Sequence, residues 1–396
     1  MILPCGESYD FRVHRLVNTV QRYAWGSATA IQEFLGQAAD GEPAAEMWMG
    51  THPVAPSRVQ RDAGSEIELS EAIGAELPYL FKVLAAARPL SLQVHPTAQM
   101  AADGFAAEET AGIGLTDPRR NFKDPNSKPE MAYALTRLES LVGFRPTATL
   151  LEVLRAVGTP LTDRLFHALE GNPGYAGIVA LLSDLLDSEG GPTADDIDVV
   201  VGACADRLRA GAGADPDRAY STVVELARSC PGDVGVVASL LLNRMTFEPG
   251  EAAFLAPGML HAHLSGMCLE IMSCSDNVLR AGLTNKHRDR PALLRCLVEG
   301  MSDAQYVDPL AIDGHSQVFA PPVTEFALSI THSASGAVTL PASGRRIVLC
   351  IEGEVALSTG GDRLTLAKGE SLYADDADGP LSVTGNGVVA QAYEPI

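Results

Sequence analysis

The stretch FEPGEAAFLAPGMLHAHLSG, residues 247–266, alternates short apolar runs with Pro-Gly pairs. Pro249 with Gly250 and Pro257 with Gly258 each mark a turn, and the run between them has the length of an ordinary strand. Near the C-terminus, IVLCIEGEVALSTGGDRLTLAKGESLYA (347–374) repeats the plan of strand, glycine turn, strand, turn and strand. Many short strands joined by Gly and Pro turns predict a β-sandwich or barrel, the jelly-roll type included.

The chain outside these stretches falls into compositional zones. Residues 1–145 mix short β-like runs with Gly and Pro, and a helical stretch is predicted over 66–87, interrupted by Pro78. Residues 146–245 predict helices, because apolar residues recur there at helical spacing. Residues 246–396 return to β, and the absence of histidine after His332 means that the last β segment has no histidine metal site of its own.

Composition limits the class of protein. With 396 residues, the chain is long enough for two or three globular domains. A net charge of −21 argues against broad nucleic-acid binding, and a site for an anionic substrate must gather its own cations against it. No apolar run reaches the ~20 residues of a membrane span, and the N-terminus lacks the pattern of a signal peptide. The seven cysteines form no CxxC pair, so we expect reduced thiols and a cytoplasmic protein.

Metal-capable side chains occur in three separate stretches. In RPLSLQVHPT (88–97), Gln93 and His95 lie two residues apart in a predicted strand and therefore share one face. In KPEMAYAL (128–135), Glu130 stands where a loop enters an apolar strand. After the second Pro-Gly turn, His261 and His263 also share a face. Each group alone has an ordinary explanation: a hydrogen-bonded polar pair, a solvated strand-edge charge, or two surface histidines.

Taken together, the three stretches offer imidazole, carboxylate and amide oxygen ligands without a thiolate. Such a ligand set fits a zinc ion that keeps an open coordination position, which is typical of a catalytic rather than a structural site. Residue spacing alone leaves open whether the constellation forms.

Six stretches, in this order along the chain, resemble type I mannose-6-phosphate isomerases, also called phosphomannose isomerases. They are YAWGS (23–27), EMWMGTHP (46–53), PYLFKVL (78–84), LSLQVHP (90–96), KPEMAYAL (128–135) and HAHLSGMCLEIMSCSDNVLRAGLTNKH (261–287). The last of these is long and specific. The helical zone and the C-terminal ~75 residues resemble the family in layout more than in motif, as variable insertions and loops do.

The resemblance implies a mainly β protein with α-helices. A catalytic cupin-type jelly-roll β-sandwich would be built from 1–145 and 246–320, a helical insertion domain from 146–245, and a second, metal-free cupin-like β domain from 321–396. The implied activity is zinc-dependent interconversion of mannose 6-phosphate and fructose 6-phosphate, with one Zn²⁺ per chain and a role in mannose and GDP-mannose metabolism. The expected assembly is a monomer or weak homodimer, with a sugar phosphate as the only partner and neither nucleic acid nor membrane.

Carried over residue by residue, the resemblance also implies a site. The implied zinc ligands are Gln93, His95, Glu130 and His261. Arg280, Lys128 and Asp276 are implied as catalytic, and Ser91 and Lys286 as substrate-binding. Two departures from the family bear on this set. The last ligating histidine is usually followed by Ala-Tyr, whereas Ala262 and His263 follow here, so His263 is the alternative ligand. TNKH, around Lys286, also replaces the commoner Thr-Pro-Lys.

The reaction requires a base that moves a proton between C2 and C1 through a cis-enediol. Asp276, a deprotonated Lys128 and a water on the metal are the candidates, and the sequence does not rank them. One rival is an iron oxygenase built on two histidines and a carboxylate. Others are a non-catalytic sugar-binding cupin and a bifunctional enzyme with a nucleotidyltransferase domain. Gln93 and the cations Lys128, Arg280 and Lys286 favour a phosphorylated substrate, and the sequence has no Gly-rich nucleotide loop.

Overall fold

The computed structural model describes residues 13–60, 65–211, 215–301, 305–334, 336–341, 344–359 and 362–395. The chain divides into two compact units. The first comprises residues 1–22, 28–83 and 307–396, and the second comprises 23–27 and 84–306. This grouping differs from the predicted one, which joined 1–145 to 246–320 and treated the helices separately. The exact domain boundaries stay a prediction.

The first unit is built almost entirely of antiparallel strands. Its strands are β1 (His14–Val17), β2 (Thr19–Gln21), β3 (Glu46–Met49), β4 (Arg58–Gln60), β5 (Glu66–Glu68), β15 (Leu310–Ala311), β16 (Ser316–Phe319), β17 (Ala327–Ser333), β18 (Val338–Thr339), β19 (Arg346–Thr359), β20 (Asp362–Ala367), β21 (Ser371–Ala374) and β22 (Ser382–Tyr393). Its short helices are α1 (Ala30–Phe34), α2 (Leu69–Ile73) and the 3₁₀ turn η4 (Asp376–Asp378). One sheet has the order β15-β16-β17-β22-β19-β21-β1-β4-β5.

The C-terminal β segment contains the three predicted strands, and the predicted turn at Gly360 and Gly361 lies outside the described residues. The long β19 pairs with β20 and with β21. A bulge interrupts β19 between Cys350 and Glu352. Gly353, just beyond it, has φ 71, and a Cβ there would lie 2.1 Å from the carbonyl oxygen of Asn386. Only glycine therefore fits this bend without a backbone shift.

The predicted helix over 66–87 is wrong for its larger part. The segment forms β5, the short α2 and, after Pro78, the strand β6 (Tyr79–Ala86), which runs from the first unit into the second. All eight residues of β6 are buried. A strand buried on both faces shows a continuous apolar run instead of alternation, and such a run is easily mistaken for a buried helix.

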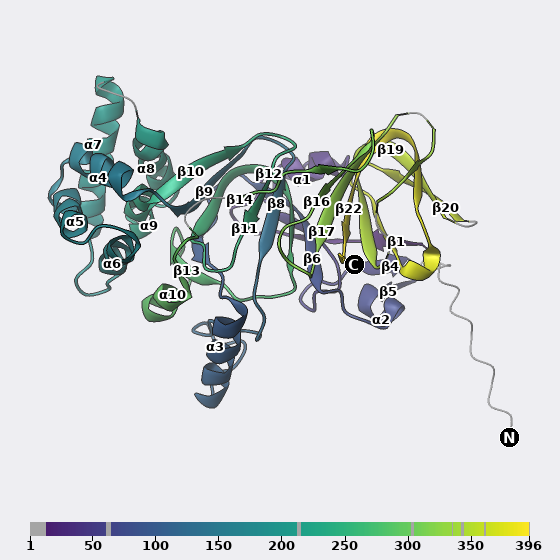
Figure 1. The fold of residues 1–396 in the computed structure, drawn as a ribbon, viewed down its shortest axis with the longest axis horizontal. Helices are drawn as coiled ribbons and strands as arrows, with labels where there is room; N and C mark the ends of the chain where they lie inside the picture. Colours follow the sequence, from purple (N-terminus) through teal and green to yellow (C-terminus); the bar gives the residue numbers. More distant parts are fainter. Residues whose placement is uncertain are drawn as a thin grey trace. The chain divides into compact units, whose positions relative to one another are not determined.

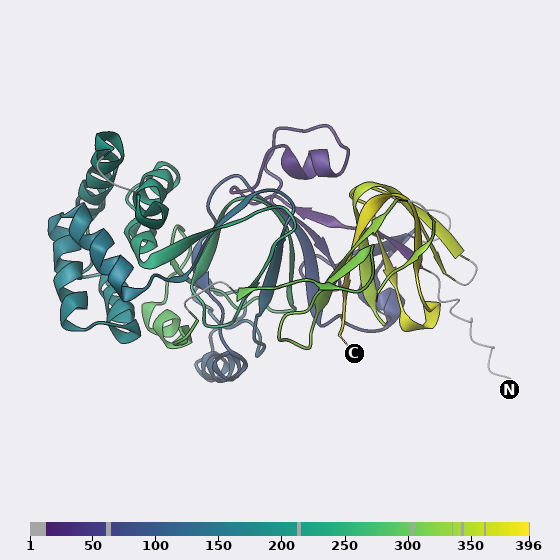
Figure 2. The ribbon, with the colours of Figure 1, turned by 45° about the horizontal axis from the view of Figure 1, so that its top comes forward.

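The second unit combines curved sheets with a cap of helices (Figures 1 and 2). Its strands are β7 (Leu92–Val94), β8 (Glu130–Ala134), β9 (Leu138–Phe144), β10 (Leu242–Phe247), β11 (Ala252–Leu255), β12 (His261–Ser273), β13 (Leu279–Gly282) and β14 (Gln305–Tyr306). Its helices are α3 (Ala98–Thr110), α4 (Thr147–Val157), α5 (Pro160–Gly171), α6 (Tyr175–Leu185), α7 (Ala194–Ala210), α8 (Ala219–Ser229), α9 (Val234–Ala238), α10 (Arg290–Cys296), η2 (Pro216–Arg218) and η3 (Ser239–Leu241). Helices α4–α9 confirm the predicted helical zone. Asp233 caps α9 by accepting a hydrogen bond from the Gly235 N–H.

The long strand β12 organises this unit. Its first residues pair with β7 and β9, and its later residues pair with β8. Leu92 and Val94 on β7, and Ala262 and Leu264 on β12, join one hydrophobic core with helices α4–α9. Because strand side chains alternate, Gln93, between Leu92 and Val94, and His261, just before Ala262, point away from the helices. The strand β7 therefore has one apolar face, which joins the helical core, and one polar face that carries Gln93.

Candidate metal centre

Three strand ends bring the predicted ligands together. His95 follows β7 directly, Glu130 begins β8, and His261 begins β12. His261 lies opposite Gln93 in the β12–β7 register, which places the two side chains on the same face. The turn at Pro257 and Gly258 stands just before β12, and the Gly258 N–H donates to the His95 carbonyl at 2.8 Å. The local turns therefore fix where each ligand-bearing strand starts.

His95, Glu130 and His261 form one buried cluster. Their ligand atoms all lie within 4.8 Å of one another. The Nε2 of His95 is 3.3 Å from one carboxylate oxygen of Glu130, and the Nε2 of His261 is 3.4 Å from the other. All three residues are at most 2% exposed. Within the described residues, this is the one group of three or more His, Cys, Asp or Glu side chains placed closely enough to hold a metal ion.

Hydrogen bonds on the far side of each ring fix the tautomers. Nδ1 of His95 lies 2.7 Å from the carbonyl oxygen of Asn277, and Nδ1 of His261 lies 3.0 Å from that of Met259. A carbonyl oxygen only accepts, so each Nδ1 carries the proton and each Nε2 presents a lone pair. Neither Nε2 has a hydrogen-bond partner in the described part of the chain. Two lone pairs thus face a carboxylate in a dry site, an arrangement that needs a cation between them, and the residues fit zinc.

The electrostatics of the cluster support a neutral His95 imidazole beside an ionised Glu130 carboxylate. Burial lowers the pKa of His95 to about 4, against the opposing pull of Glu130. Burial alone would raise the pKa of the Glu130 carboxyl, but its electrostatic interactions with His95 and with the Lys128 ammonium hold it well below its usual range. The charge states at neutral pH are therefore those a divalent metal requires of its ligands.

The fourth predicted ligand and its neighbour lie at the edge of the cluster. Gln93 is half-buried, and its amide oxygen accepts a hydrogen bond from the Ser91 hydroxyl at 3.2 Å. In the β13–β7 register, Gln93 also lies opposite Arg280. Gln93 therefore stands between His261 on one neighbouring strand and Arg280 on the other, and the ligand role of its amide oxygen stays a prediction.

The charged residues predicted around the metal, three cations and one aspartate, differ in burial and in their neighbours. The Lys128 ammonium is buried and lies 3.2 Å from a Glu130 oxygen. Arg280 is half-buried, and burial lowers the pKa of its guanidinium. Asp276 is half-buried in the segment between β12 and β13, where its N–H donates to Asp124. Lys286 is exposed beyond β13. The structure thus brings Lys128 into contact with the cluster and leaves the roles of the other three as predictions.

His263, the alternative ligand, has different neighbours. Its Nδ1 lies 2.8 Å from the Ser140 hydroxyl, and its Nε2 lies 3.7 Å from a carboxylate oxygen of Glu270. All three side chains are buried. The geometry therefore favours His261 over His263 as the ligand, and it places His263 in a separate polar group farther along β12.

Two kinds of residue were not identified from the sequence: those that orient the ligands through main-chain carbonyls, and a buried lysine in the first unit. Asn277 and Met259 orient the ligands through main-chain carbonyls, which carry no side-chain signature. Lys82, in the first unit, is 5% exposed and lies 3.7 Å from Glu46, which also accepts a hydrogen bond from the Trp48 indole. The signal for Lys82 was present, since PYLFKVL holds a single cation within an apolar run.

Two other expectations bear on the setting of the protein. No helix in the described residues is long and apolar enough to cross a membrane. The cysteines at 204, 230, 268, 274, 296 and 350 all carry free thiols, as their spacing suggests, and Cys5 lies outside the described residues.

Comparison with known proteins identifies the family. The family model described as phosphomannose isomerase type I, catalytic domain, matches residues 13–147, and that described as mannose-6-phosphate isomerase, cupin domain, matches 316–394. Mannose-6-phosphate isomerase of Escherichia coli K12 is 35% identical over 401 residues, covering 97% of this chain and all of that one. The human enzyme is 32% identical over 393 residues, covering 88% of this chain and 89% of that one.

Solved structures agree with the sequence comparisons. A crystal structure of mannose 6-phosphate isomerase from Salmonella typhimurium, bound to fructose 6-phosphate and zinc, has a TM-score of 0.85 and 34% identity, covering 97% of this chain and all of that one. Another, bound with zinc and yttrium, has the same TM-score and identity. The predicted mainly β fold with a cupin domain is confirmed. The chain belongs to the mannose-6-phosphate isomerase family, as its six motifs predicted.

Proposed function

We propose that this chain interconverts mannose 6-phosphate and fructose 6-phosphate, with one zinc ion held by His95, Glu130, His261 and Gln93. The observation that carries the proposal is the pair of buried Nε2 lone pairs facing the Glu130 carboxylate. Relatives with this activity align along nearly the whole chain. The same two-histidine, one-carboxylate set suits iron oxygenases, but the buried Lys128 ammonium beside the carboxylate suits an anionic substrate better.

The chemistry divides between the metal and the side chains around it. When bound, zinc supplies a Lewis acid for the oxygens on C1 and C2 of the open-chain sugar. The Lys128 ammonium, near the metal, donates to the developing negative charge on the cis-enediol. The planar donors of Arg280, opposite Gln93 on β13, bind either the enediol oxygens or the phosphate.

The base that carries the proton between C2 and C1 is assigned to Asp276. Lys128 is the competing side chain, but as a base it would have to give up the ion pair with Glu130 at 3.2 Å. Leaving a buried carboxylate without its partner is costly. Asp276 lies three residues before β13 begins and four before Arg280. The family resemblance assigns its side chain to the pocket. Ser91 and Lys286 would add donors for the phosphate, and the link to GDP-mannose metabolism stays a prediction.

The test is isomerisation of mannose 6-phosphate in an assay coupled to fructose 6-phosphate. Purified protein, chelator-treated protein and treated protein with zinc restored are compared. We expect activity to be lost on chelation and recovered with zinc. Folded, zinc-loaded protein that converts no mannose 6-phosphate would reject the proposal and favour another metallo-cupin reaction.

Variants then separate the roles. Arg280→Lys and Asp276→Asn should each lower kcat by at least about 100-fold, the usual scale for a positioned donor or general base. Arg155→Ala is the matched control, because Arg155 is an exposed arginine on α4 whose contacts within the described residues lie in the helical zone, with Glu170 at 3.9 Å and the centre of the Phe166 ring 4.5 Å from its guanidinium. Its kcat should equal that of the unaltered protein.

A further inference from the structure

Asn277 occupies a fully buried position in the segment between β12 and β13. Its side-chain amide is used on both ends. The carbonyl oxygen accepts from the N–H groups of Lys123 and Asp124 at 2.7 and 3.3 Å. The amino group donates to the main-chain oxygens of Asp124 and Asn126 at 2.7 and 2.9 Å. One side chain thus clamps the backbone of residues 123–126.

The main chain of Asn277 serves the metal centre directly. Its carbonyl oxygen is the acceptor, at 2.7 Å, for the Nδ1 proton of His95. That bond determines which ring nitrogen of His95 faces Glu130 and how the ring is turned. The position of this carbonyl in turn depends on the clamp, because the side chain and the carbonyl belong to one buried residue.

The clamped segment leads to the other half of the centre. Residues 123–126 run on through Ser127 to Lys128, and Glu130 begins β8. The Ser127 carbonyl accepts from the Ser273 hydroxyl at 2.7 Å, and the Pro129 carbonyl accepts from the Ser273 N–H at 3.2 Å. Asn277 and Ser273 therefore fix this segment at two points, just before the ligand that faces His95.

We propose that Asn277 is a positioning residue for the metal centre, which holds His95 and the segment bearing Lys128 and Glu130 in register with each other. The inference rests on the zinc site of the proposed function. Hydrogen-bonded groups behind metal ligands are known to set ligand orientation, and their loss weakens metal binding. A hydrogen-bonded group behind a metal ligand usually supports that one ligand. Asn277 instead supports two ligands, which belong to different strands.

The experiment is a zinc titration against a chromophoric chelator, with no sugar phosphate present. Asn277→Ala should bind zinc about 10–100-fold more weakly than the unaltered protein. Asn18→Ala is the matched control: Asn18 also uses both ends of its amide, donating to Ser371 and accepting from Ser57 at 2.8 Å each, but it lies in the first unit. Its zinc affinity should stay unchanged, whatever its loss of stability.

A second readout follows His95 itself. In zinc-loaded protein with ¹⁵N-labelled histidine, the proton on Nδ1 of His95 should give a resonance protected from exchange with water. In Asn277→Ala that resonance should shift and exchange faster, whereas in Asn18→Ala it should not change. If Asn277→Ala does not fold, Asn277→Asp, of the same shape but without the amino group, replaces it in both measurements.

The outcomes are distinct from those that test the isomerase proposal. Zinc affinity in the folded Asn277 variant equal to that of the unaltered protein would reject the positioning role. Equal weakening in the Asn18 control would reject it too, and so would a zinc-loaded, unaltered protein whose His95 proton sits on Nε2. Unaltered protein that binds zinc tightly without isomerising the sugar would reject the proposed function and leave the role of Asn277 standing.

Discussion

Two histidines on the same face of β12 have separate roles because their neighbours differ. His261 lies opposite Gln93 and within reach of Glu130, and its Nδ1 is held by the Met259 carbonyl. His263, two residues on, lies opposite Ser140, and its Nδ1 contacts that hydroxyl. The Nε2 of His263 lies 3.7 Å from a carboxylate oxygen of Glu270. One of them therefore joins the cluster and the other does not.

Replacing these two histidines separately should distinguish them. His261→Gln should bind zinc at least about 100-fold more weakly, because the imidazole nitrogen is replaced by an amide oxygen, which is a poorer ligand for zinc. His263→Gln keeps a group able to hydrogen-bond Ser140 and should retain one zinc ion per chain. Metal content after gel filtration and the chelator titration measure both. The reverse pattern, with zinc lost in His263→Gln and kept in His261→Gln, would show that the ligand assignment is wrong.

At this scale, the sequence predicted the residues whose chemistry lies in their side chains. His95, Glu130 and His261 were identified as ligands from residue type, strand position and family resemblance, and the structure brings them together. Asn277 was not identified, because its carbonyl acts on His95 and any residue has a carbonyl. The family resemblance implied that Lys128 is catalytic, and the structure places its ammonium 3.2 Å from Glu130. No sequence pattern shows that Lys286 is exposed.

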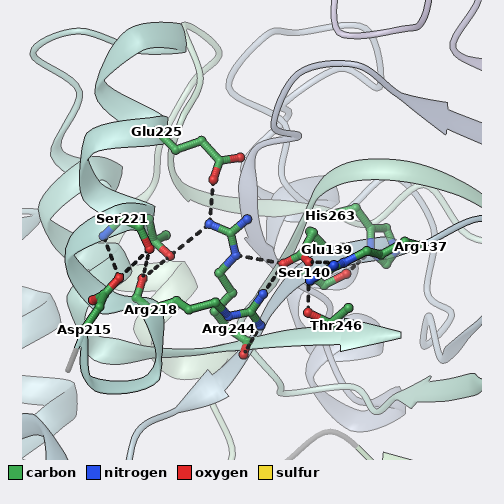
Figure 3. Close-up of polar contacts among 11 residues, drawn as sticks. Arg137, Glu139, Ser140, Asp215, Arg218, Ser221, Glu225, Arg244, Thr246 and His263 are labelled. Carbon is green, nitrogen blue, oxygen red and sulfur yellow. Dashed lines mark hydrogen bonds and ion pairs between the residues drawn. The ribbon is translucent and has the colours of Figure 1, made fainter. Parts of the chain in front are cut away.

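Glu139 on β9 connects the strands to the helices of the second unit (Figure 3). Its carboxylate accepts from Arg244 on β10 at 2.9 Å and from Arg218, before α8, at 2.7 Å. Arg244 also contacts Glu225 on α8 at 2.6 Å. Arg137, whose side chain is largely exposed, also contacts the Glu139 carboxylate, at 3.0 Å. A carboxylate shared by three guanidinium groups holds α8 against β9 and β10.

Glu139→Gln should destabilise the protein most at neutral pH. Removing one charge from a buried group of ions costs about 2–3 kcal/mol, less than a fully buried pair because Arg137 and Arg218 are partly exposed. Burial would raise the pKa of Glu139, but hydrogen bonds from Arg244 and Thr246 hold it below its usual range. A carboxyl whose pKa is lowered in the folded state stabilises the fold at every pH above the pKa that it has in the unfolded chain, which is near 4.5. That stability is lost as the pH falls below 4.5 toward the folded-state pKa.

Urea unfolding at several pH values measures this effect. The free energy of unfolding of the unaltered protein should fall from about pH 4.5 downward more steeply than that of Glu139→Gln. The two curves should therefore approach each other in acid. Curves that remain parallel from pH 7 to pH 3 would mean that the Glu139 carboxyl does not contribute to acid sensitivity.

Gly266 marks the place where β12 changes partner. A register shift lies between His263 and Ser265 in the pairing with β9, and pairing with β8 begins at Cys268. Gly266 has φ 115, and a Cβ there would lie 2.4 Å from the carbonyl oxygen of Arg137. The bend that carries β12 from one sheet neighbour to the next therefore depends on a missing side chain.

Gly266→Ala should lower the free energy of unfolding by about 1–3 kcal/mol or more, through both the positive φ and the close contact with backbone. Gly202→Ala is the matched control with the opposite sign. Gly202 is exposed within α7, and a Cβ there meets nothing within 4 Å. It should stabilise the protein by up to about 1 kcal/mol through helix propensity. A Gly266→Ala protein as stable as the unaltered one would contradict this account of the bend.

Helices and strands could be predicted from the sequence where apolar residues recur at the spacing of only one type of element. Helices α4–α8 carry apolar residues at helical spacing, and α4 buries Leu150, Val153, Leu154 and Val157, as the pattern predicts. The strand β6 was mistaken because both of its faces are buried. The grouping of strands into units was also beyond the sequence, because β1 (residues 14–17) pairs with β21 (371–374), and periodicity carries no information about such distant partners.

At the scale of the whole molecule, the zinc site belongs to one unit alone. His95, Glu130 and His261 all lie between residues 84 and 306, in the second unit. A ligand that binds only the folded state stabilises it by about 2.7 kcal/mol at 100 times its dissociation constant. Zinc binding should therefore raise the stability of the second unit directly. It should change the stability of the first unit only if the unfolding of the two units is coupled.

The two tryptophans allow that distinction to be measured. Trp25 lies in the second unit and Trp48 in the first, and the chain has no others. Trp48→Phe leaves Trp25 as the fluorescence reporter, and Trp25→Phe leaves Trp48. Thermal unfolding is followed for each variant with zinc bound and after chelation.

Chelation should lower the midpoint reported by Trp25 by several degrees, since about 2.7 kcal/mol corresponds to roughly 5–10 °C for a unit of this size. The midpoint reported by Trp48 should move less. Equal shifts at both tryptophans would contradict independent unfolding and show that the two units melt as one cooperative structure. No shift at Trp25, with zinc demonstrably removed, would contradict the placement of the metal among His95, Glu130 and His261, because filling that cluster must stabilise the strands that supply it.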